Sequence, residues 1–253
     1  MMRVKRICAL VLVLGLLVSL AACSSAASND ESTLSIAAAA SLEQVLEGEI
    51  IPLFEAQHTD ISVSGMYGGS YQLRTQIELG LQADLFFPAS MGAMTGLYET
   101  VLPLLTNTLV LIAPRDADLT VTGFADIQNA ETIAIGDPSL VPAGRYAEEV
   151  LTQLGIWDTV QERAHFGTSV SAVLNWVASG SADVGIVYLT DAMLSDQVTI
   201  IAEAPTDSLS TPIIYPVGIL RDAPNQAAAR LFLAFLQSAD VQAIFEAHGF
   251  AVY

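Results

Sequence analysis

From Leu34 to the C-terminus, short apolar runs typical of strands alternate with segments whose apolar residues fall at helical spacing. The strand-like runs are 34–38, 61–66, 83–87, 132–135 and 184–188, and the helix-like segments are 42–54, 71–79, 143–154 and 170–177. Pro52 inside the first helical segment predicts a kink or a break. Alternation of this kind predicts an α/β fold with mostly parallel sheets flanked by helices.

Two similar segments indicate that this pattern occurs in two lobes. Residues 80–84 (Gly-Leu-Gln-Ala-Asp) and 180–183 (Gly-Ser-Ala-Asp) each stand where a helix ends at glycine and a strand begins. Two long apolar strands, 109–113 and 213–220, are expected to link the lobes. We therefore assign residues 34–112 and 217–253, with closing helices at 225–237 and 240–248, to lobe I. Residues 113–216 form lobe II.

The N-terminus has the pattern of an export signal. Three basic residues precede residue 7, residues 7–20 are almost entirely apolar, and the small residues Ala21 and Ala22 precede Cys23. The tetrad Leu20-Ala21-Ala22-Cys23 resembles a bacterial lipobox, which implies that residues 1–22 are removed and that Cys23 is lipidated. Residues 23–33 then form a flexible tether, and the protein is extracytoplasmic and lipid-anchored to the cell membrane. The alternative is ordinary cleavage with Cys23 incidental.

The charge balance disfavours nucleic acid as a partner. Three of the nine basic residues precede Cys23, which leaves six against 27 acidic residues, a formal net charge of −21. Nucleic-acid binding depends on basic patches that displace counterions. Removal of Cys8 with the signal leaves Cys23 as the single cysteine, so no intramolecular disulfide is expected.

Motifs of enzymes are missing from the sequence. No Ser-x-x-Lys or Gly-x-Ser-x-Gly pattern follows the signal, and no phosphate-binding loop with a Gly-Lys pair occurs. The three histidines, His58, His165 and His248, are far apart and lack metal-ligand spacing. We therefore expect neither catalysis nor a cofactor, and no direct ligands for a metal cation.

Small or hydroxyl-bearing residues instead stand at the predicted starts of helices. They are Ser41, Ser70, Ala143 after Pro142, and Val170 after Ser169. Helix N-termini present unpaired N–H groups and a partial positive charge, so they bind anions without a cationic side chain. In open α/β sheets these termini meet at the carboxyl ends of the strands. Each residue on its own is also compatible with an ordinary helix cap.

Several segments resemble the molybdate-binding family of bacterial ABC importers. They are Ala37-Ala38-Ala39-Ala40-Ser41-Leu42, Ala83-Asp84-Leu85-Phe86, the stretch from Gly136-Asp137-Pro138 to Val141-Pro142-Ala143-Gly144, Gly185-Ile186-Val187-Tyr188, and Ile244-Phe245 with Gly249-Phe250. Together they cover nearly all of the chain after the signal, in the family's order. The resemblance implies a two-lobed type II periplasmic binding fold whose lobes are joined by two crossover strands, with the oxyanion between them.

The resemblance also implies the ligand residues. Ser41 and Ser70 of lobe I would donate from the backbone and from Oγ, Ala143 and Val170 of lobe II from the backbone N–H, and Tyr188 from its hydroxyl. The sequence departs from the family around Ser70, because Gly68-Gly69-Ser70-Tyr71 replaces a run of serines. The donors there could therefore shift by one residue. Arg145 lies close to this set, and we expect it to point to solvent or to Glu148 or Glu149 rather than to the ligand.

The expected ligand is molybdate or tungstate. Both are fully deprotonated near neutral pH and only accept hydrogen bonds, which suits a pocket of donors. Hydrogen phosphate needs an acceptor, and none of the five residues supplies a carboxylate. The expected partners are an ABC permease and its ATPase, with the protein itself a monomer. A sulfate- or phosphate-type importer component and a sensory lipoprotein remain as alternatives, and a hydrolase is disfavoured.

Overall fold

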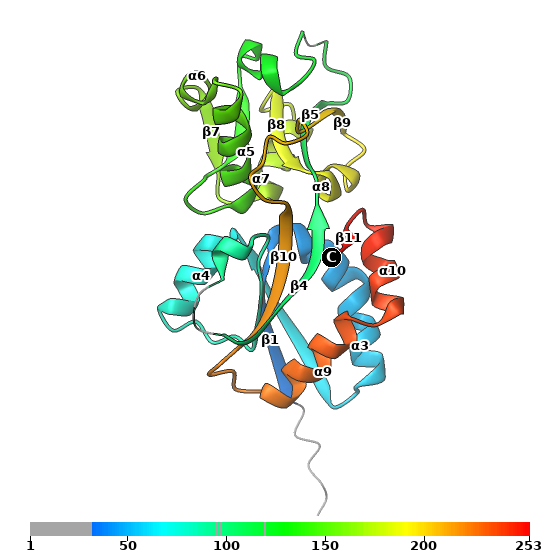
Figure 1. Ribbon diagram of the computed structural model, residues 1–253. Coiled ribbons are helices and arrows are strands. Elements are labelled where there is room, and N and C mark those ends of the chain that lie inside the picture. The colour runs from blue at the N-terminus through cyan, green and yellow to red at the C-terminus, as the bar shows by residue number, and fades with distance from the viewer. Residues whose placement is uncertain (1–31, 95, 97, 119) are drawn as a thin grey trace, which may run out of the picture. The chain divides into compact units, whose positions relative to one another are not determined.

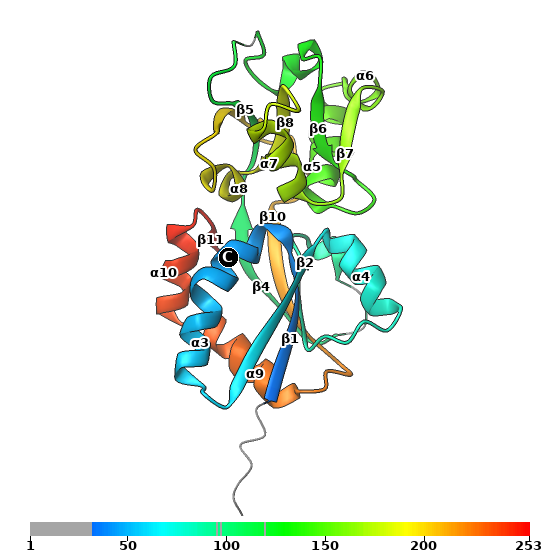
Figure 2. The ribbon, with the colours of Figure 1, turned by 180° about the vertical axis from the view of Figure 1, so that it is seen from behind.

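The structure, a computed structural model, describes residues 32–94, 96, 98–118 and 120–253. The predicted signal, Cys23 and most of the predicted tether lie outside these residues. Residues 32–253 form one unit that contains two sheets (Figures 1 and 2). We call the part built on the first sheet lobe I and the part built on the second sheet lobe II.

The sheet of lobe I has the strand order β11-β4-β10-β3-β1-β2. Its strands are β1 (Ser32–Ala39), β2 (Ile61–Gly68), β3 (Leu85–Phe87), β4 (Tyr98–Asn107), β10 (Ile213–Leu220) and β11 (Ala251–Val252). β1 pairs in parallel with β2 and β3, whereas β10 is antiparallel to β3 and β4. The carboxyl ends of β1 and β2 therefore lie at the same edge, where η1 (Ala40–Leu42) and α4 (Ser70–Glu78) begin.

The sheet of lobe II has the order β7-β6-β8-β5-β9. Its strands are β5 (Leu109–Pro114), β6 (Ile133–Gly136), β7 (Ala164–Gly167), β8 (Val184–Tyr188) and β9 (Val198–Glu203). β6 is parallel to β7 and β8, and β5 is antiparallel to β8 and β9.

Helices cover the sheets of both lobes. Those of lobe I are η1 (Ala40–Leu42), α2 (Glu43–Val45), η2 (Leu46–Ile50), α3 (Ile51–Gln57), α4 (Ser70–Glu78), η3 (Met91–Ala93), α9 (Gln226–Leu236) and α10 (Ala239–Ala247). Those of lobe II are η4 (Phe124–Asn129), α5 (Pro142–Gln153), α6 (Trp157–Gln161), α7 (Val170–Ala178) and α8 (Leu189–Met193). In lobe I, α4 lies on one side of the sheet and α3, α9 and α10 on the other (Figures 1 and 2). In lobe II, α5 and α7 both pack on β6 and β8.

The predicted α/β, two-lobed fold is confirmed, but the sheets are mixed rather than mostly parallel. Among the described strands, four pairings are parallel and five are antiparallel. The antiparallel pairings involve the strands next to the two crossings between the lobes, because a chain that leaves a lobe and returns runs in opposite directions. Period-two and continuous apolar patterns do not specify strand direction, so the sequence left this open.

The sheets also divide the chain at different residues from those expected. The strand at 109–112, expected in lobe I, belongs to β5 in the second sheet, and residues 213–216, expected in lobe II, belong to β10 in the first sheet. The chain crosses at Thr108 and again between Glu203 and Ile213. The crossing strands were predicted correctly as strands, but hydrogen bonding to a distant partner decides which sheet each one joins.

The irregularity expected at Pro52 is present in the first helical segment. A π-helical stretch, η2, immediately precedes α3, whose second residue is Pro52. Proline cannot donate to the preceding turn, and a wider turn there avoids the missing bond. The segment still buries Leu46, Ile50 and Phe54 completely.

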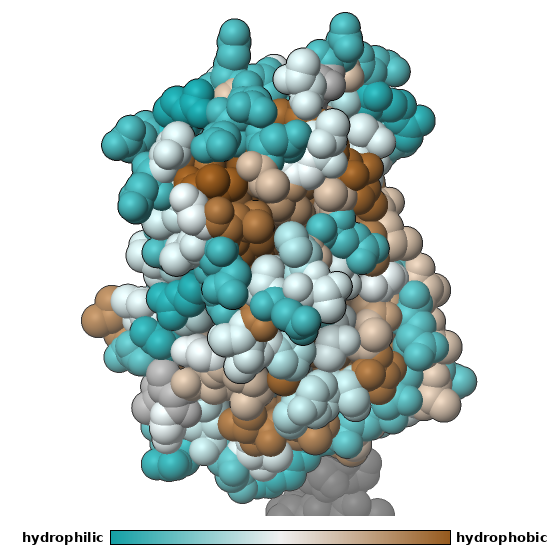
Figure 3. All heavy atoms as spheres, turned by 45° about the horizontal axis from the view of Figure 1, so that its top comes forward, coloured by the Kyte–Doolittle hydropathy of each residue, from teal (hydrophilic) through white to brown (hydrophobic). Residues whose placement is uncertain are grey.

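The cores are apolar, and the surface keeps few large apolar side chains. On the face in Figure 3, apolar groups gather in places among hydrophilic ones. In the described part of the chain no single helix has the length and hydropathy to cross a membrane. Only α9 and α10 together meet that test, across a 66° bend, and their Phe232, Leu236 and Phe245 are fully buried.

Candidate functional site

A small cavity lies where the helix N-termini of the two lobes meet. About 190 Å³ of this space is not filled by protein atoms. The centre of a water-sized sphere can occupy only about 10 Å³ of it. Its lining comprises Ala39, Ala40, Ser41, Gly68, Gly69, Ser70 and Ala89 from lobe I and Val141, Pro142, Val170 and Tyr188 from lobe II. About 10–15 Å³ by that measure accommodates one water molecule. The cavity in this structure is therefore small and nearly filled by its lining.

Two serines at helix starts contribute the hydroxyl groups of lobe I. Ser41 lies in η1 directly after β1, and Ser70 is the first residue of α4 after β2. Both are buried, at 4% and 0% exposure. The Ser70 Oγ accepts a hydrogen bond from the backbone N–H of Ala89 at 3.0 Å, and the Ser41 Oγ lies 3.0 Å from the Tyr215 hydroxyl.

Two helices of lobe II point their N-termini toward the cavity. α7 begins at Val170, with Ser169 as its N-cap, and α5 begins at Pro142, with Ala143 as its second residue. The first N–H groups of a helix have no intrahelical acceptor, so both turns offer donors to an anion. Val141, Pro142 and Val170 line the cavity directly, whereas the buried Ala143 lies one residue beyond its lining.

Close packing behind α5 holds its N-terminus in place. A Cβ atom on Gly144 would lie 1.9 Å from the carbonyl oxygen of Gly136, so only glycine allows this helix to approach the end of β6. The pattern Pro142-Ala143-Gly144 thus has a structural reason as well as a place beside the cavity.

Tyr188, the last residue of β8, lines the cavity with a buried hydroxyl that has no hydrogen-bond partner among the described residues. A buried hydroxyl without a partner costs about 1–3 kcal/mol. Burial raises the pKa of this hydroxyl well above its ordinary value, with a further contribution from Tyr215, so the group keeps its proton. Tyr188 is therefore a protonated donor with no hydrogen bond of normal length to the described residues, and the Tyr215 hydroxyl is near enough to contribute to its pKa shift.

The two lobes touch each other around the cavity. The backbone N–H of Tyr71 in α4 donates to the Leu140 carbonyl of lobe II at 3.0 Å. A Cβ atom on Gly69 would lie 2.7 Å from that same carbonyl oxygen and 2.9 Å from the carbonyl oxygen of Thr168. Any side chain at Gly69 would thus meet the backbone of lobe II.

Arg145 is exposed to solvent as expected, but it also makes a contact that was not expected. Its guanidinium carbon is 4.2 Å from the ring centre of Tyr71, so it stacks on an aromatic ring of lobe I. The contact is across the lobes, and helical spacing alone could not reveal it. Arg145 does line a neighbouring cavity of about 420 Å³, together with Tyr146 and Glu149, but it does not line the small cavity.

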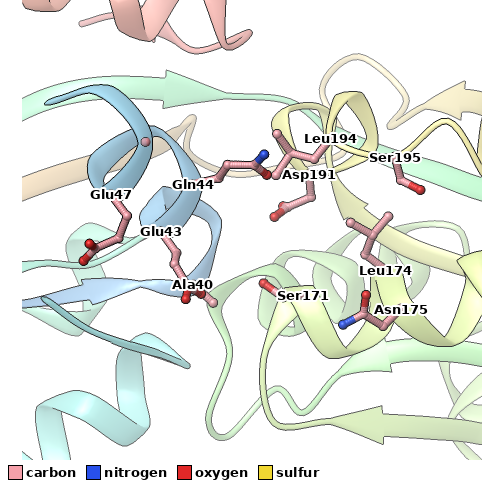
Figure 4. Close-up of a pocket in the computed structure, with 11 residues that line it drawn as sticks. Ala40, Glu43, Gln44, Glu47, Ser171, Leu174, Asn175, Asp191, Leu194 and Ser195 are labelled. Atoms are coloured by element: carbon pink, nitrogen blue, oxygen red, sulfur yellow. The ribbon is translucent and has the colours of Figure 1, made fainter. Parts of the chain in front are cut away.

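A larger cavity of about 640 Å³ lies on another side of the small one and shares Ala40 with it. Figure 4 shows Glu43 and Glu47 on one wall and Asp191, Ser171 and Asn175 on the other. Three carboxyl groups and no basic residue line this space, so the smaller cavity suits an anion better. Among the described residues no group of three or more His, Cys, Asp or Glu side chains could hold a metal ion.

Four of the five residues named from the resemblance, Ser41, Ser70, Val170 and Tyr188, line one cavity, and Ala143 lies directly behind it. The residues that hydrogen-bond to Ser41 or to its partner were not predicted from the sequence. Tyr215 in β10 is fully buried and contacts Ser41, and Asn107 at the end of β4 contacts Tyr215. The signal that could have found Tyr215 is a tyrosine hydroxyl in an otherwise apolar strand, since a buried hydroxyl needs a partner.

Comparison with known proteins gives consistent matches over the described chain. The model of the family "Bacterial extracellular solute-binding protein" matches residues 34–251. YvgL of Bacillus subtilis (strain 168), which is named as an ABC transporter substrate-binding lipoprotein, is 40% identical over 241 residues, 91% of this chain and 92% of the relative. The molybdate-binding protein ModA of Haemophilus influenzae is 35% identical over 230 residues, 86% of this chain and 89% of the relative.

A solved structure extends the likeness to three dimensions. The periplasmic molybdate-binding protein of Azotobacter vinelandii superposes with a TM-score of 0.74 at 26% identity, covering 87% of this chain and 99% of that structure. With a family model that spans nearly all of the described residues and relatives above 30% identity along most of their length, the chain belongs to the family of bacterial extracellular solute-binding proteins.

Proposed function

We propose that this protein is the solute-binding component of an ABC importer and that it captures molybdate, and also tungstate, in the small cavity between its lobes. It then delivers the oxyanion to a membrane permease driven by an ATPase. Membership of a solute-binding family and the names of the relatives support transport rather than an enzymatic role.

The observation that carries the proposal is the buried Tyr188 hydroxyl, which has no hydrogen bond of normal length to the described residues, in a cavity whose other polar groups can donate. Ser70 already accepts a bond from Ala89, so its own hydrogen is available for a ligand. The N-termini of α5 and α7 add backbone N–H groups. A fully deprotonated tetrahedral oxyanion offers acceptors to all of them.

Neutral donors also explain how so acidic a protein holds a dianion. The cavity lining contains no Asp, Glu, Lys or Arg among the described residues, so binding depends on oriented dipoles and not on ion pairs. Charge-assisted hydrogen bonds of this kind are stronger than bonds between neutral groups, because the ligand oxygens carry the charge.

Calorimetry of the mature protein with molybdate, tungstate, sulfate and phosphate tests this function. We expect molybdate and tungstate to bind with affinities at least a hundredfold above that of phosphate. Tight binding of sulfate alone would support the sulfate-importer alternative. No binding of any of the four ions would refute an oxyanion function.

We also propose that the protein is extracytoplasmic and lipid-anchored through Cys23. The N-terminal pattern and the lipoprotein name of the Bacillus relative support this. Cys23→Ser is expected to leave the signal uncleaved or to release the protein from the membrane, as measured by fractionation and by intact mass. Unchanged processing and membrane attachment in this variant would contradict lipidation at Cys23.

A further inference from the structure

A chain of hydrogen bonds connects Ser41 to the crossing point of the lobes. The Ser41 Oγ lies 3.0 Å from the Tyr215 Oη, and the Asn107 Nδ2 lies 3.2 Å from that same Oη. Asn107 Nδ2 also donates to the Thr190 Oγ1 of lobe II at 2.8 Å. Of these four residues only Ser41 lines the small cavity.

The backbone fixes the orientation of the Asn107 amide. The N–H of Thr108 lies 2.8 Å from the Asn107 Oδ1, and an N–H group can only donate. The oxygen of the amide therefore faces Thr108. Its NH2 group then faces Tyr215 and Thr190 and supplies one hydrogen to each.

This orientation makes the Tyr215 oxygen an acceptor from Asn107. Because Tyr215 is buried, its own hydrogen needs an acceptor, and we assign that role to the Ser41 Oγ, which lies 3.0 Å away. Burial raises the pKa of Tyr215 well above its ordinary value, with a further contribution from Asp191, so this hydrogen is retained. Ser41 accepts it, and the remaining hydrogen of Ser41 is free to point into the cavity.

The Ser70 hydroxyl can also donate its hydrogen into the cavity, for a different reason. Its Oγ accepts from the Ala89 backbone N–H at 3.0 Å, so its hydrogen is also free for the cavity. Each serine oxygen thus accepts a hydrogen bond on the side away from the cavity. The donor to Ser70 is a backbone N–H, and the donor to Ser41 is Tyr215, which itself accepts from Asn107. We call Asn107, Tyr215 and Ser41 the relay.

We propose that Asn107 and Tyr215 are positioning residues that orient the Ser41 hydrogen into the cavity and so favour fully deprotonated oxyanions over those that carry a proton. The proposal rests on the oxyanion-binding function above. Without the relay, the Ser41 hydroxyl is free to rotate and to accept a hydrogen from a protonated ligand. With it, Tyr215 occupies one of the two lone pairs of Ser41 and leaves the Ser41 hydrogen for the cavity.

The first test is a double-mutant cycle measured by calorimetry with molybdate. Tyr215→Phe removes the donor to Ser41 with little change in shape and is expected to weaken binding about five- to twentyfold. In the Ser41→Ala background the same change is expected to have less than a twofold effect, since Tyr215 acts through Ser41. Effects that simply multiply would mean that Tyr215 has only a structural role and would overturn the relay.

The second test reverses the polarity of the relay. In Asn107→Asp a carboxylate replaces the NH2 donor, so Tyr215 turns its hydrogen to that residue and Ser41 donates to Tyr215. Ser41 then presents a lone pair to the cavity. The ratio of molybdate to hydrogen phosphate affinity at pH 8, where both ligands are dianions, is expected to fall at least tenfold.

Asn175→Asp is the matched control for charge. It adds the same negative charge to the wall of the neighbouring large cavity without changing a residue of the relay. We expect it to lower the affinities for molybdate and for hydrogen phosphate by the same factor. An unchanged affinity ratio in Asn107→Asp, with thermal unfolding showing a folded protein, would overturn the relay but leave the function intact. A wild-type protein that binds no oxyanion would refute the function itself.

Discussion

The guanidinium carbon of Arg145 lies 4.2 Å from the centre of the Tyr71 ring, which joins the first turn of α5 in lobe II to the start of α4 in lobe I. This contact is near the small cavity but not part of its lining. It is a cation–π contact, which at an exposed site contributes about 0.5–1 kcal/mol. We therefore expect Arg145 to stabilise the contact between the lobes and not to pair with the ligand.

From this contact we expect Arg145→Gln to weaken molybdate binding only about two- to fivefold, as measured by calorimetry. Arg115→Gln is the control, since it removes the same charge from a residue just after β5 that does not line the cavity. A loss greater than that of Ser41→Ala would mean that an ion pair belongs in the site.

Tyr188→Phe is expected to weaken molybdate binding about tenfold to a hundredfold, because a hydrogen bond to a charged acceptor contributes about 1.5–3 kcal/mol. The ligand-free protein should be as stable as the wild type or more stable, since the variant removes a buried hydroxyl without a partner. Urea unfolding without ligand measures the second effect.

The control for Tyr188 is Tyr67→Phe. The Tyr67 hydroxyl donates to the Glu47 Oε1 at 2.7 Å, away from the small cavity. Its loss is expected to lower stability and to leave affinity within threefold of the wild type. If Tyr188→Phe also retained full affinity, the hydroxyl would not be a ligand donor.

Gly69→Ala is expected to weaken binding at least tenfold by holding the lobes apart. Its new Cβ atom would meet the Leu140 carbonyl oxygen at 2.7 Å, whereas the φ of −64° suits alanine without strain. Lobe I alone should therefore fold normally. Small-angle scattering should show a decrease in the radius of gyration when molybdate is added to the wild type, and a smaller decrease in the variant.

Gly48→Ala is the matched control for this substitution. A Cβ atom on Gly48 meets nothing within 4 Å, and the residue lies in η2. We expect unchanged affinity and a gain in stability of up to about 1 kcal/mol, because alanine favours helical backbone over glycine. Equal affinity in the two glycine variants would contradict a closing motion at Gly69.

Asp191 is expected to make the protein less stable as the pH rises from about 4 to about 7. Burial raises the pKa of this carboxyl group to about 7, although the backbone N–H of Tyr188 opposes the shift. In this range the folded protein keeps a proton that the unfolded chain has released, so the free energy of unfolding falls with rising pH and stays low above pH 7. Asp191→Asn removes this effect.

Urea unfolding of wild type and Asp191→Asn at pH 4.5 and pH 8 measures the difference. The free energy of unfolding of the variant minus that of the wild type should be about 2–4 kcal/mol larger at pH 8 than at pH 4.5. Asp126→Asn is the control, and its difference from the wild type should be the same at both pH values, because a lowered pKa changes stability only below about pH 4. Slight burial raises the pKa of Asp126, but hydrogen bonds from Thr122 and Gly123 outweigh it, and the net shift is downward. A pH-independent difference for Asp191→Asn would show that this carboxyl titrates normally.

The sequence by itself determined the elements of the fold and the candidate site. Apolar periodicity is local, so the alternation after Leu34 was enough to predict the strands and helices near Ser41, Ser70, Ala143, Val170 and Tyr188. The strands β4, β7 and β9 and the helices α6 and α8 were not predicted. Short elements carry little periodic signal, and the ten-residue β4 is largely half-buried or exposed, so it has no clear apolar pattern. The low count of basic residues favours the proposal that an anion is held by neutral donors.

Only the tertiary structure decided which of these groups meet and how they are oriented. Ser41 and Tyr215 are 174 residues apart, Asn107 and Tyr215 are 108 apart, and Arg145 reaches a tyrosine of the other lobe. Such contacts depend on strand order, on direction and on the closeness of the lobes at Gly69, none of which leaves a periodic mark in the sequence. The sequence therefore specifies donors at helix starts, whereas the packing of two lobes decides that they surround one small cavity.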